Sequence, residues 1–239
     1  MSEMLFRRDS YQREAQAKVI AHTIEGGVVL DGSIFYPKGG GQPGDSGHLR
    51  WDTQTMSIAT AIKGDGDQIV LIPAEPQALP PVGAILVQEL DWERRHKHMR
   101  VHTALHLLSV AVPFGVTGGS IGAGQGRLDF DMPEIPENRE IIEQALQAFV
   151  EMDVVVAEEW IDQATLDASP ELVKTLAVNP PRGAGQIRLV RIGRGDDQID
   201  LQPCGGTHVA RTGEIGALRL GKIEKKGRMN RRIYLHLDD

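Results

Sequence analysis

Four residues in two distant segments combine the side chains and the spacing of a metal site. His102 and His106 stand four positions apart in HTALH, which would place both imidazoles on one helix face about one turn apart. The segment QPCGGTHVA contains the single cysteine of the chain, Cys204, followed four positions later by His208. Three imidazoles and one thiolate are a donor set suited to tetrahedral zinc. The sequence therefore predicts one zinc ion per chain.

The same residues allow a second chemistry that needs no metal. In that interpretation Cys204 is a nucleophile, activated by His208 or His106. It leaves one or two buried histidines without a partner, at a cost of roughly 1–3 kcal/mol for each ring, so zinc is the preferred hypothesis. Peptidase chemistry of the HExxH type is disfavoured, because Thr103 occupies the position of the glutamate that would act as general base.

Hydrophobic patterns indicate which elements would position these donors. Residues 101–112 (VHTALHLLSVAV) are apolar around nearly the whole helical circumference, which predicts a buried helix. Gly205 and Gly206 disfavour a helix between Cys204 and His208, and they let the chain curl so that both side chains point at one centre.

The remaining sequence predicts an α+β protein of two domains. Short apolar runs separated by turn residues indicate a small antiparallel, barrel-like β domain over residues 1–90. In residues 91–239 strands and helices do not alternate as βαβ units, so we expect an α+β domain with a mainly antiparallel sheet. A further helix is expected at about 137–151 and a short helix capped by Ser169. The strands expected in the second domain are RLDFD, DVVVAEEW, QIRLVRIG, QIDLQ, IGALRLGKIE and RRIYLHL.

The bulk composition is that of an average soluble protein, with 41% hydrophobic and 25% charged residues in a chain of 239. No apolar run is long enough to cross a bilayer, and the N-terminus lacks the pattern of a secretory signal. One cysteine excludes an internal disulfide and fits a reducing compartment. We therefore expect a cytoplasmic protein without a membrane partner.

The formal net charge of −7 hides a segregated distribution. Residues 222–232 (KIEKKGRMNRR) contain six basic side chains against Glu224, and residues 93–100 (ERRHKHMR) contain four against Glu93. Such runs can form a basic face for nucleic acid on an acidic protein, or they can be ordinary solvated surface. The sequence leaves both interpretations open.

The segment GGGQPG, residues 39–44, satisfies the G-x-G-x-x-G pattern of dinucleotide-binding proteins. That fingerprint requires a helix directly after the loop. Pro43 and the Gly-Asp-Ser-Gly that follows are poor helix formers, so the context predicts strand, loop and strand. A nucleotide site is therefore not expected here.

Taken together, the motifs resemble the editing domain of alanyl-tRNA synthetase. The resemblance runs from about residue 25 to the C-terminus and includes YPKGGGQPGDSG, HTALHLL, CGGTHV, TGEIG from Thr212, and Gly227 with Arg231-Arg232. The chain is too short to hold an aminoacylation domain as well. It is therefore similar to the free-standing AlaX editing proteins, in their medium-length form.

This resemblance implies an aminoacyl-tRNA deacylase, a carboxylic ester hydrolase that removes serine, and for some members glycine, from mischarged tRNA(Ala). Such editing is needed because a synthetase pocket discriminates poorly between similar small amino acids. ATP is not expected as a partner. By position, the family motifs assign the zinc ligands to His102, His106, Cys204 and His208, and the amino-acid pocket to Gly39, Gly40, Gly41 and Gln42.

The other expected roles depend on side-chain chemistry. Thr103 is a candidate catalytic residue that could hold a water or an oxyanion. Leu105 and VTGGS at 116–120 depart from the synthetase pattern, so a preference for serine over glycine is not assigned. Phosphates of the tRNA are expected to contact Arg94, Arg95, Arg100, Lys222, Lys225, Lys226, Arg228, Arg231 and Arg232.

Two alternatives stay open at this point. Four protein ligands are typical of structural zinc, so the chain could be a non-catalytic tRNA-binding module. The glycines at 39–41 could form a plain tight β-turn instead of a pocket for a small aminoacyl group.

Overall fold

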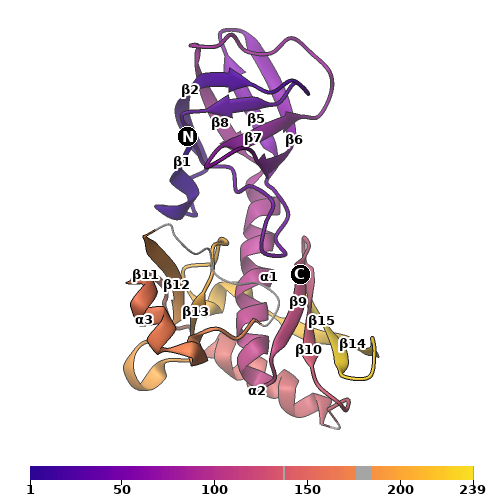
Figure 1. The fold of residues 1–239 in the computed structure, drawn as a ribbon. Coiled ribbons are helices and arrows are strands. Elements are labelled where there is room, and N and C mark those ends of the chain that lie inside the picture. The colour runs from indigo at the N-terminus through magenta and orange to yellow at the C-terminus, as the bar shows by residue number, and fades with distance from the viewer. Residues whose placement is uncertain (137, 176–184, 239) are drawn as a thin grey trace. The chain divides into compact units, whose positions relative to one another are not determined.

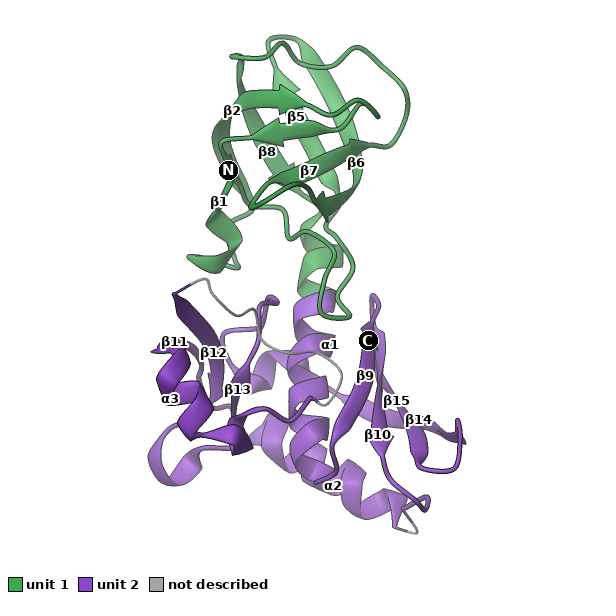
Figure 2. Ribbon diagram, viewed as in Figure 1, with its two compact units in different colours: residues 1–97 green, residues 98–239 purple. Residues whose placement is uncertain are grey.

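The computed structural model describes residues 1–136, 138–175 and 185–238 (Figure 1). The chain divides into two compact units, residues 1–97 and residues 98–239 (Figure 2). The sequence placed the division at 90/91, just before helix α1 (Trp92–Ala111). In the structure α1 begins in unit 1 and continues into unit 2.

Unit 1 is a closed antiparallel barrel, which confirms the barrel-like β domain predicted for the N-terminal region. Apolar side chains such as Val19, Leu49 and Leu71 are fully buried in its core. Outside the barrel, β1 (Glu3–Met4) pairs in parallel with β4 (Gly32–Ser33), and the 3-10 turn η1 (Leu5–Arg7) follows β1. Around the barrel the strand order is β2 (Glu14–His22), β3 (Val28–Leu30), β7 (Ile69–Pro73), β6 (Gln54–Lys63), β5 (Gly47–Trp51) and β8 (Ile85–Leu90).

Two details of unit 1 differ from the prediction. Strand β2 was not predicted, and SIFYP (residues 33–37), one of the short apolar runs from which the β domain was predicted, contributes only Ser33 to a strand. Side chains satisfy part of the buried backbone of this irregular segment: Gln88 Oε1 accepts from Ile34 N at 3.0 Å, and Asp45 Oδ2 accepts from Tyr36 N at 2.6 Å. A buried backbone needs hydrogen-bond partners, but strand pairing is not the only source.

The glycine-rich loop is a tight turn that follows the irregular segment 34–38 and is followed by a strand, so only the strand after the loop agrees with the prediction. Gly39 and Gln42 exchange backbone hydrogen bonds of 3.1 and 2.9 Å, and the two residues between them, Gly40 and Gly41, have φ of 56° and 79°. Positive φ at both central positions is the geometry that favours glycine. Downstream, a side chain at Gly44 would collide with the backbone of Ala61. The next element is strand β5, so the loop does not lead into a dinucleotide-binding helix.

The described residues of unit 2 form two antiparallel sheets, in agreement with the predicted α+β class. One sheet has the order β14 (Leu218–Lys225), β15 (Asn230–Leu237), β10 (Gln125–Asp131) and β9 (Val116–Ile121). The other has the order β11 (Val156–Asp162), β12 (Gln186–Ile192) and β13 (Asp200–Pro203). The remaining elements are α2 (Arg139–Glu151), α3 (Gln163–Ala168) and the 3-10 turns η2 (Pro170–Leu172), η3 (Gly195–Asp197) and η4 (Thr212–Ile215).

The second half of α1 runs between the two sheets (Figure 1). Residues 101–109 are all buried, which confirms the buried helix predicted from their composition. The close approach of β10 on one side depends on Gly126, where a side chain would meet Val101 and Leu105. Among the described residues, no helix is both long and apolar enough to cross a membrane.

The helix boundaries show where the sequence pattern was misleading. α1 begins at Trp92 instead of Val101, because its first turns carry charged residues that hide the apolar period. α3 was not predicted, and its cap is Asp162, whose Oδ1 accepts from Thr165 N at 2.7 Å. Ser169 occupies the N-cap of η2, as predicted, although the element is a 3-10 turn and the Ser169 side chain makes no capping hydrogen bond.

Candidate metal centre

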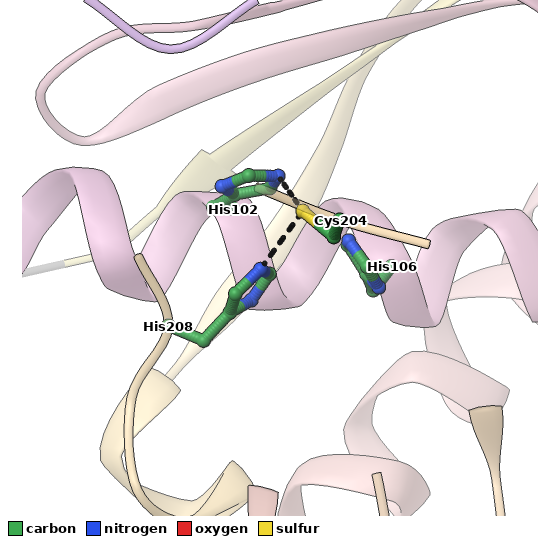
Figure 3. A group of neighbouring side chains, drawn as sticks. All are labelled: His102, His106, Cys204 and His208. Carbon is green, nitrogen blue, oxygen red and sulfur yellow. Dashed lines mark hydrogen bonds between the residues drawn. The ribbon is translucent and has the colours of Figure 1, made fainter. Parts of the chain in front are cut away.

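The two donor segments meet in unit 2 (Figure 3). The ligand atoms of the four predicted residues all lie within 4.8 Å of one another and form a group that could hold a metal ion. Cys204 Sγ is 3.5 Å from His102 Nε2 and 3.3 Å from His208 Nε2. Tetrahedral zinc with Zn–N of about 2.0 Å and Zn–S of about 2.3 Å requires nitrogen–sulfur separations of roughly 3.5 Å. The two distances fit that requirement.

Helix α1 positions two of the donors. His102 and His106 are each 7% exposed and their ring centroids are 5.3 Å apart, as expected for neighbours one turn apart on a helix. The ring of His208 lies 4.2 Å from that of His102 and 4.6 Å from that of His106. The three imidazoles therefore surround one point from two elements.

A buried arginine holds the loop that carries the other two donors. Arg188 on β12 donates from its guanidinium to the backbone oxygens of Cys204 and Gly206, at 2.7 and 3.0 Å, and to Glu158 Oε1 at 2.5 Å. Its backbone oxygen also accepts from Cys204 N at 3.2 Å. These bonds fix the backbone of the loop after β13, so the position of the Cys204 thiol is defined despite the glycines that follow it.

A polar network behind His106 fixes the orientation of that ring. Asp200 Oδ2 lies 2.9 Å from His106 Nδ1, and Asp200 Oδ1 accepts from Lys174 Nζ at 2.5 Å. Gln202 Nε2 donates to Asp200 Oδ2 at 2.7 Å and to Ser109 Oγ at 3.3 Å. A carboxylate behind a ligand histidine is a recurrent partner of metal sites.

Thr103, the candidate catalytic residue, lies on α1 between His102 and His106 and contacts a third donor, His208. Its side chain is fully buried, and its hydroxyl donates to Met99 O at 3.0 Å. The hydroxyl oxygen accepts from His208 Nδ1 at 3.1 Å and from Val209 N at 3.3 Å. Because the single hydroxyl hydrogen goes to Met99 O, Thr103 contacts the ligand histidine His208 as an acceptor. Its role as a catalytic residue stays a prediction.

The electrostatics of the cluster suit a cation. Burial alone raises the pKa of the Cys204 thiol, but the charges of His102 and His208 outweigh burial and hold that pKa well below its ordinary value. Burial and the charge of His102 lower the pKa of His208 well below its ordinary value. Burial also acts to lower the pKa of His106, but hydrogen bonds to Asp200 and Cys204 outweigh it and raise that pKa to about 9. A metal ion requires the thiolate and neutral imidazoles, so its binding would displace the proton from His106.

The predicted pocket residues lie in unit 1. Gly39, Gly40 and Gly41 form the turn described above, Tyr36 Oη donates to Gly39 O at 2.8 Å, and Gln42 is 1% exposed. The glycines are thus explained locally by the turn. Their assignment to an amino-acid pocket stays a prediction.

The basic residues predicted to contact RNA fall into two groups. Arg95 is fully buried and pairs with Asp45, Arg231 is 4% exposed and donates to backbone oxygens, and neither guanidinium faces solvent. Arg94 and Arg100 are half-buried and bind backbone oxygens, of Gly44 and Ile215 respectively. Arg232 makes two hydrogen bonds to Asp129. The exposed members of the set are Lys222, Lys225, Lys226 and Arg228, on and beside the β14–β15 hairpin.

Sequence reasoning missed the residues that support the donors, although one pattern could have indicated two of them. Asp200, Gln202 and Cys204 alternate along QIDLQPC, so a strand that directs Cys204 inward directs the other two to the same face. Arg188 gave no such signal, since a charged residue in a strand usually faces solvent.

Two family models match this chain, and one of them includes part of the site. The family model of the threonyl and alanyl tRNA synthetase second additional domain matches residues 187–234, which include Cys204 and His208. The model of class II (A) tRNA synthetases matches residues 8–94.

Whole-length relatives are more specific. The alanyl-tRNA editing protein AlaX-M of Methanosarcina acetivorans is 30% identical over the whole of both chains. That of Saccharolobus solfataricus is 33% identical over 98% of each. The alanine–tRNA ligase of Pyrobaculum neutrophilum is 34% identical over 92% of this chain, which spans 25% of the ligase. The chain therefore belongs to the AlaX-M family of alanyl-tRNA editing proteins.

Proposed function

We propose that this protein hydrolyses the ester bond that joins a wrong amino acid to tRNA(Ala), at a zinc ion held by the four donors of unit 2. The observation that supports this most is the convergence of three imidazoles and one thiol from segments about a hundred residues apart. The names of the full-length relatives supply the substrate class. Since aminoacyl-tRNA is made and used in translation, we place the activity in the cytoplasm.

A zinc ion bound there would supply a Lewis acid that orients the substrate or lowers the pKa of a water. The chain's own contribution is to hold the donor rings in place and to keep the site dry, which strengthens electrostatic interactions. Thr103 holds His208 and Asp200 holds His106. Gly205 is exposed, and a side chain there would meet open space. We therefore propose that the aminoacyl end reaches the site beside Gly205.

Serine is the proposed amino acid, with glycine as the further candidate. Both are small, and an editing site of this class accepts what a synthetase pocket fails to reject. We propose that Gly39–Gln42 contribute to the amino-acid pocket, an assignment supported by the motif and not by a contact. For the tRNA, we propose that phosphates contact the exposed basic residues Lys222, Lys225, Lys226 and Arg228.

One observation favours a second candidate, a thiol hydrolase that needs no metal. The pKa of Cys204 is depressed by the charges of neighbouring histidines, although burial opposes this, and His208 Nε2 lies 3.3 Å from Sγ. A thiolate beside an imidazole is also the arrangement of a cysteine nucleophile. The third candidate, a non-catalytic tRNA-binding module, is favoured by the closed set of four protein ligands.

A deacylation assay separates the three candidates. Labelled Ser-tRNA(Ala), Gly-tRNA(Ala) and correctly charged Ala-tRNA(Ala) are each incubated with wild type as purified, with chelator-treated wild type, and with chelator-treated protein reloaded with Zn²⁺. The zinc hydrolase predicts release of serine that stops on chelation and returns on reloading, with Ala-tRNA(Ala) spared. Full activity after chelation would favour the thiol hydrolase, and no release by any form would favour the binding module.

A further inference from the structure

We propose that Asp200 is a positioning residue of the metal centre: its carboxylate holds His106 in the tautomer that presents Nε2 to the ion, and Lys174 moderates the charge of that carboxylate. This inference rests on the proposed metal-dependent function. It concerns how this chain orients one ligand histidine, and it is supported by the hydrogen bonds of Asp200.

The hydrogen atoms of the network can be assigned one by one. Lys174 Nζ, 2.5 Å from Asp200 Oδ1, can only donate, and Gln202 Nε2, 2.7 Å from Asp200 Oδ2, does the same. Ser109 Oγ donates to His106 O at 2.7 Å, which leaves that hydroxyl oxygen to accept from Gln202. Asp200, as a carboxylate, can only accept. Two contacts of His106 Nδ1 remain, to Asp200 Oδ2 at 2.9 Å and to Gln202 Nε2 at 3.1 Å. Both hydrogens of Gln202 Nε2 are already donated and the carboxylate has none to give, so the hydrogen of the Asp200 contact lies on Nδ1.

That assignment leaves Nε2 of His106 with its lone pair on the side of the ring opposite Asp200, where the other three donors lie. A carboxylate that accepts from Nδ1 of a ligand histidine leaves Nε2 to bind the metal, which is a recurrent arrangement in metal sites. Asp200 is 2% exposed and has few other conformations available. A buried carboxylate is costly unless it is paired and hydrogen-bonded, so its presence behind a ligand ring needs an explanation of this kind.

Lys174 has the opposite influence on the ion. It is the most exposed member of the network, with a side chain 28% exposed against 0% for Asp200. Its positive charge weakens the attraction of the cluster for a cation, whereas the Asp200 charge strengthens it. Asp200 also keeps two further hydrogen bonds, to His106 and Gln202, so removal of the lysine head group does not release the carboxylate.

These opposite signs give the test. Co²⁺ is titrated into the metal-free full-length protein in competition with a chelator, and the dissociation constant and the visible absorption bands of bound Co²⁺ are measured without tRNA. Asp200→Asn is expected to raise the dissociation constant about 10- to 100-fold and to shift the bands. Loss of a hydrogen-bonding partner behind a metal ligand typically weakens metal affinity by that factor. Lys174→Met is expected to bind Co²⁺ at least as tightly as wild type.

A matched control lies in the same three-stranded sheet. Glu159 on β11 makes a two-bond pair with Arg191, at 2.6 Å for each bond, and contacts none of the four donors. Glu159→Gln removes one negative charge, as Asp200→Asn does, and is expected to keep the wild-type dissociation constant. Equal weakening by both changes would show a general loss of charge or stability and would overturn the inference.

The remaining outcomes are also decisive. Asp200→Asn with the wild-type dissociation constant and spectrum would overturn the inference, and so would weaker binding by Lys174→Met, which can be read even if the Asp200 variant fails to fold. Nitrogen-15 NMR of the zinc-loaded wild type should show the hydrogen of His106 on Nδ1, and coordination through Nδ1 would contradict the proposal. Wild type that binds neither Zn²⁺ nor Co²⁺ would instead overturn the proposed function.

Discussion

Helix α1 carries buried polar side chains in both units, and Arg95 in unit 1 differs in kind from the histidine pair in unit 2. In unit 1, Arg95 donates to Asp45, to Ser10 O at 3.0 Å and to Ile34 O at 2.7 Å. Donors therefore meet acceptors, and the charge of the guanidinium is balanced by the carboxylate. In unit 2, His102 and His106 of the same helix face Cys204 and His208. Here every member of the cluster offers an atom that can bind a metal ion.

The difference separates a polar group that supports the fold from one that awaits a ligand. The charges of the buried ion pair balance within the protein, although Asp45 Oδ1 has no hydrogen-bond partner among the described residues, and breaking such a pair costs about 3–5 kcal/mol. Converging lone pairs repel one another unless a cation or a proton lies between them. In the metal-free protein the pKa of His106 is raised, and the pKa values of Cys204 and His208 are lowered. Arg95 thus supports the fold, whereas the buried histidines and the half-buried Cys204 form a group that could hold a metal ion.

The largest effect is expected where a donor is removed from the metal set. Cys204→Ala should abolish stoichiometric zinc binding and lower deacylation of Ser-tRNA(Ala) by about 10³-fold or more, the scale seen when one strong electrostatic element of an active site is lost. Metal content and single-turnover deacylation measure this. The free energy of unfolding of the metal-free protein, measured in urea, should change far less than the deacylation rate. A variant that keeps zinc and activity would remove the basis of the comparison.

The Arg95 pair should show the reverse pattern. Arg95→Met is expected to lower the free energy of unfolding by about 3–5 kcal/mol, because it leaves the Asp45 carboxylate buried without its cation. The zinc content of the folded fraction should stay at the wild-type value. Urea unfolding and metal analysis measure the two quantities. Arg94→Met is the matched control: this half-buried neighbour donates to Gly44 O at 2.9 Å, and its loss should cost only about 0.5–1.5 kcal/mol.

The basic hairpin offers a smaller effect on binding. Reversal of two exposed charges, Lys225→Glu with Arg228→Glu, should weaken binding of tRNA(Ala) and reduce the slope of log affinity against log salt by about 2, since each phosphate contact contributes about one. Filter binding at several salt concentrations measures this. The same number of reversals at exposed Lys18 and Arg194 should leave the slope closer to that of wild type. Equal slopes for all three proteins would argue against the hairpin as the RNA face.

The smallest effect concerns pH and the metal-free protein. His208 has a lowered pKa, so on unfolding below pH 6.5 it gains a proton, and stability should fall as the solution becomes more acidic. Asp200, whose pKa burial raises but its bond to His106 lowers to about 2, adds a further loss below pH 4. Between pH 6.5 and 9 the raised pKa of His106 makes stability fall with pH, while the lowered pKa of Cys204 makes it rise.

These last two contributions oppose each other, so the free energy of unfolding of the metal-free protein should be nearly level between pH 6.5 and 9. Urea unfolding at a series of pH values measures the profile, with zinc-loaded protein as the comparison. Stability that increases from pH 6.5 down to pH 5 would contradict the assigned directions.

The sequence by itself determined the donors and the class of fold. Spacings of four placed His102 near His106 and Cys204 near His208, and the apolar circumference of residues 101–112 required burial. Alternating apolar residues and turn signals were enough to predict an antiparallel barrel in unit 1. These are local properties, since the periods of a helix and a strand act over a few residues.

Only the tertiary structure decided which polar residues support the site and which serve the fold. Arg95 and Arg231 stand in basic runs that read as surface, but both are buried and bound within the protein. Asp200 meets His106 across 94 positions in sequence, and Thr103 meets His208 across 105. The hydrophobic period of a helix or strand gives no information about a contact between residues so far apart in the sequence. Burial of a charge depends on what the rest of the chain brings to it, so the residues that orient the metal ligands became visible only in the folded protein.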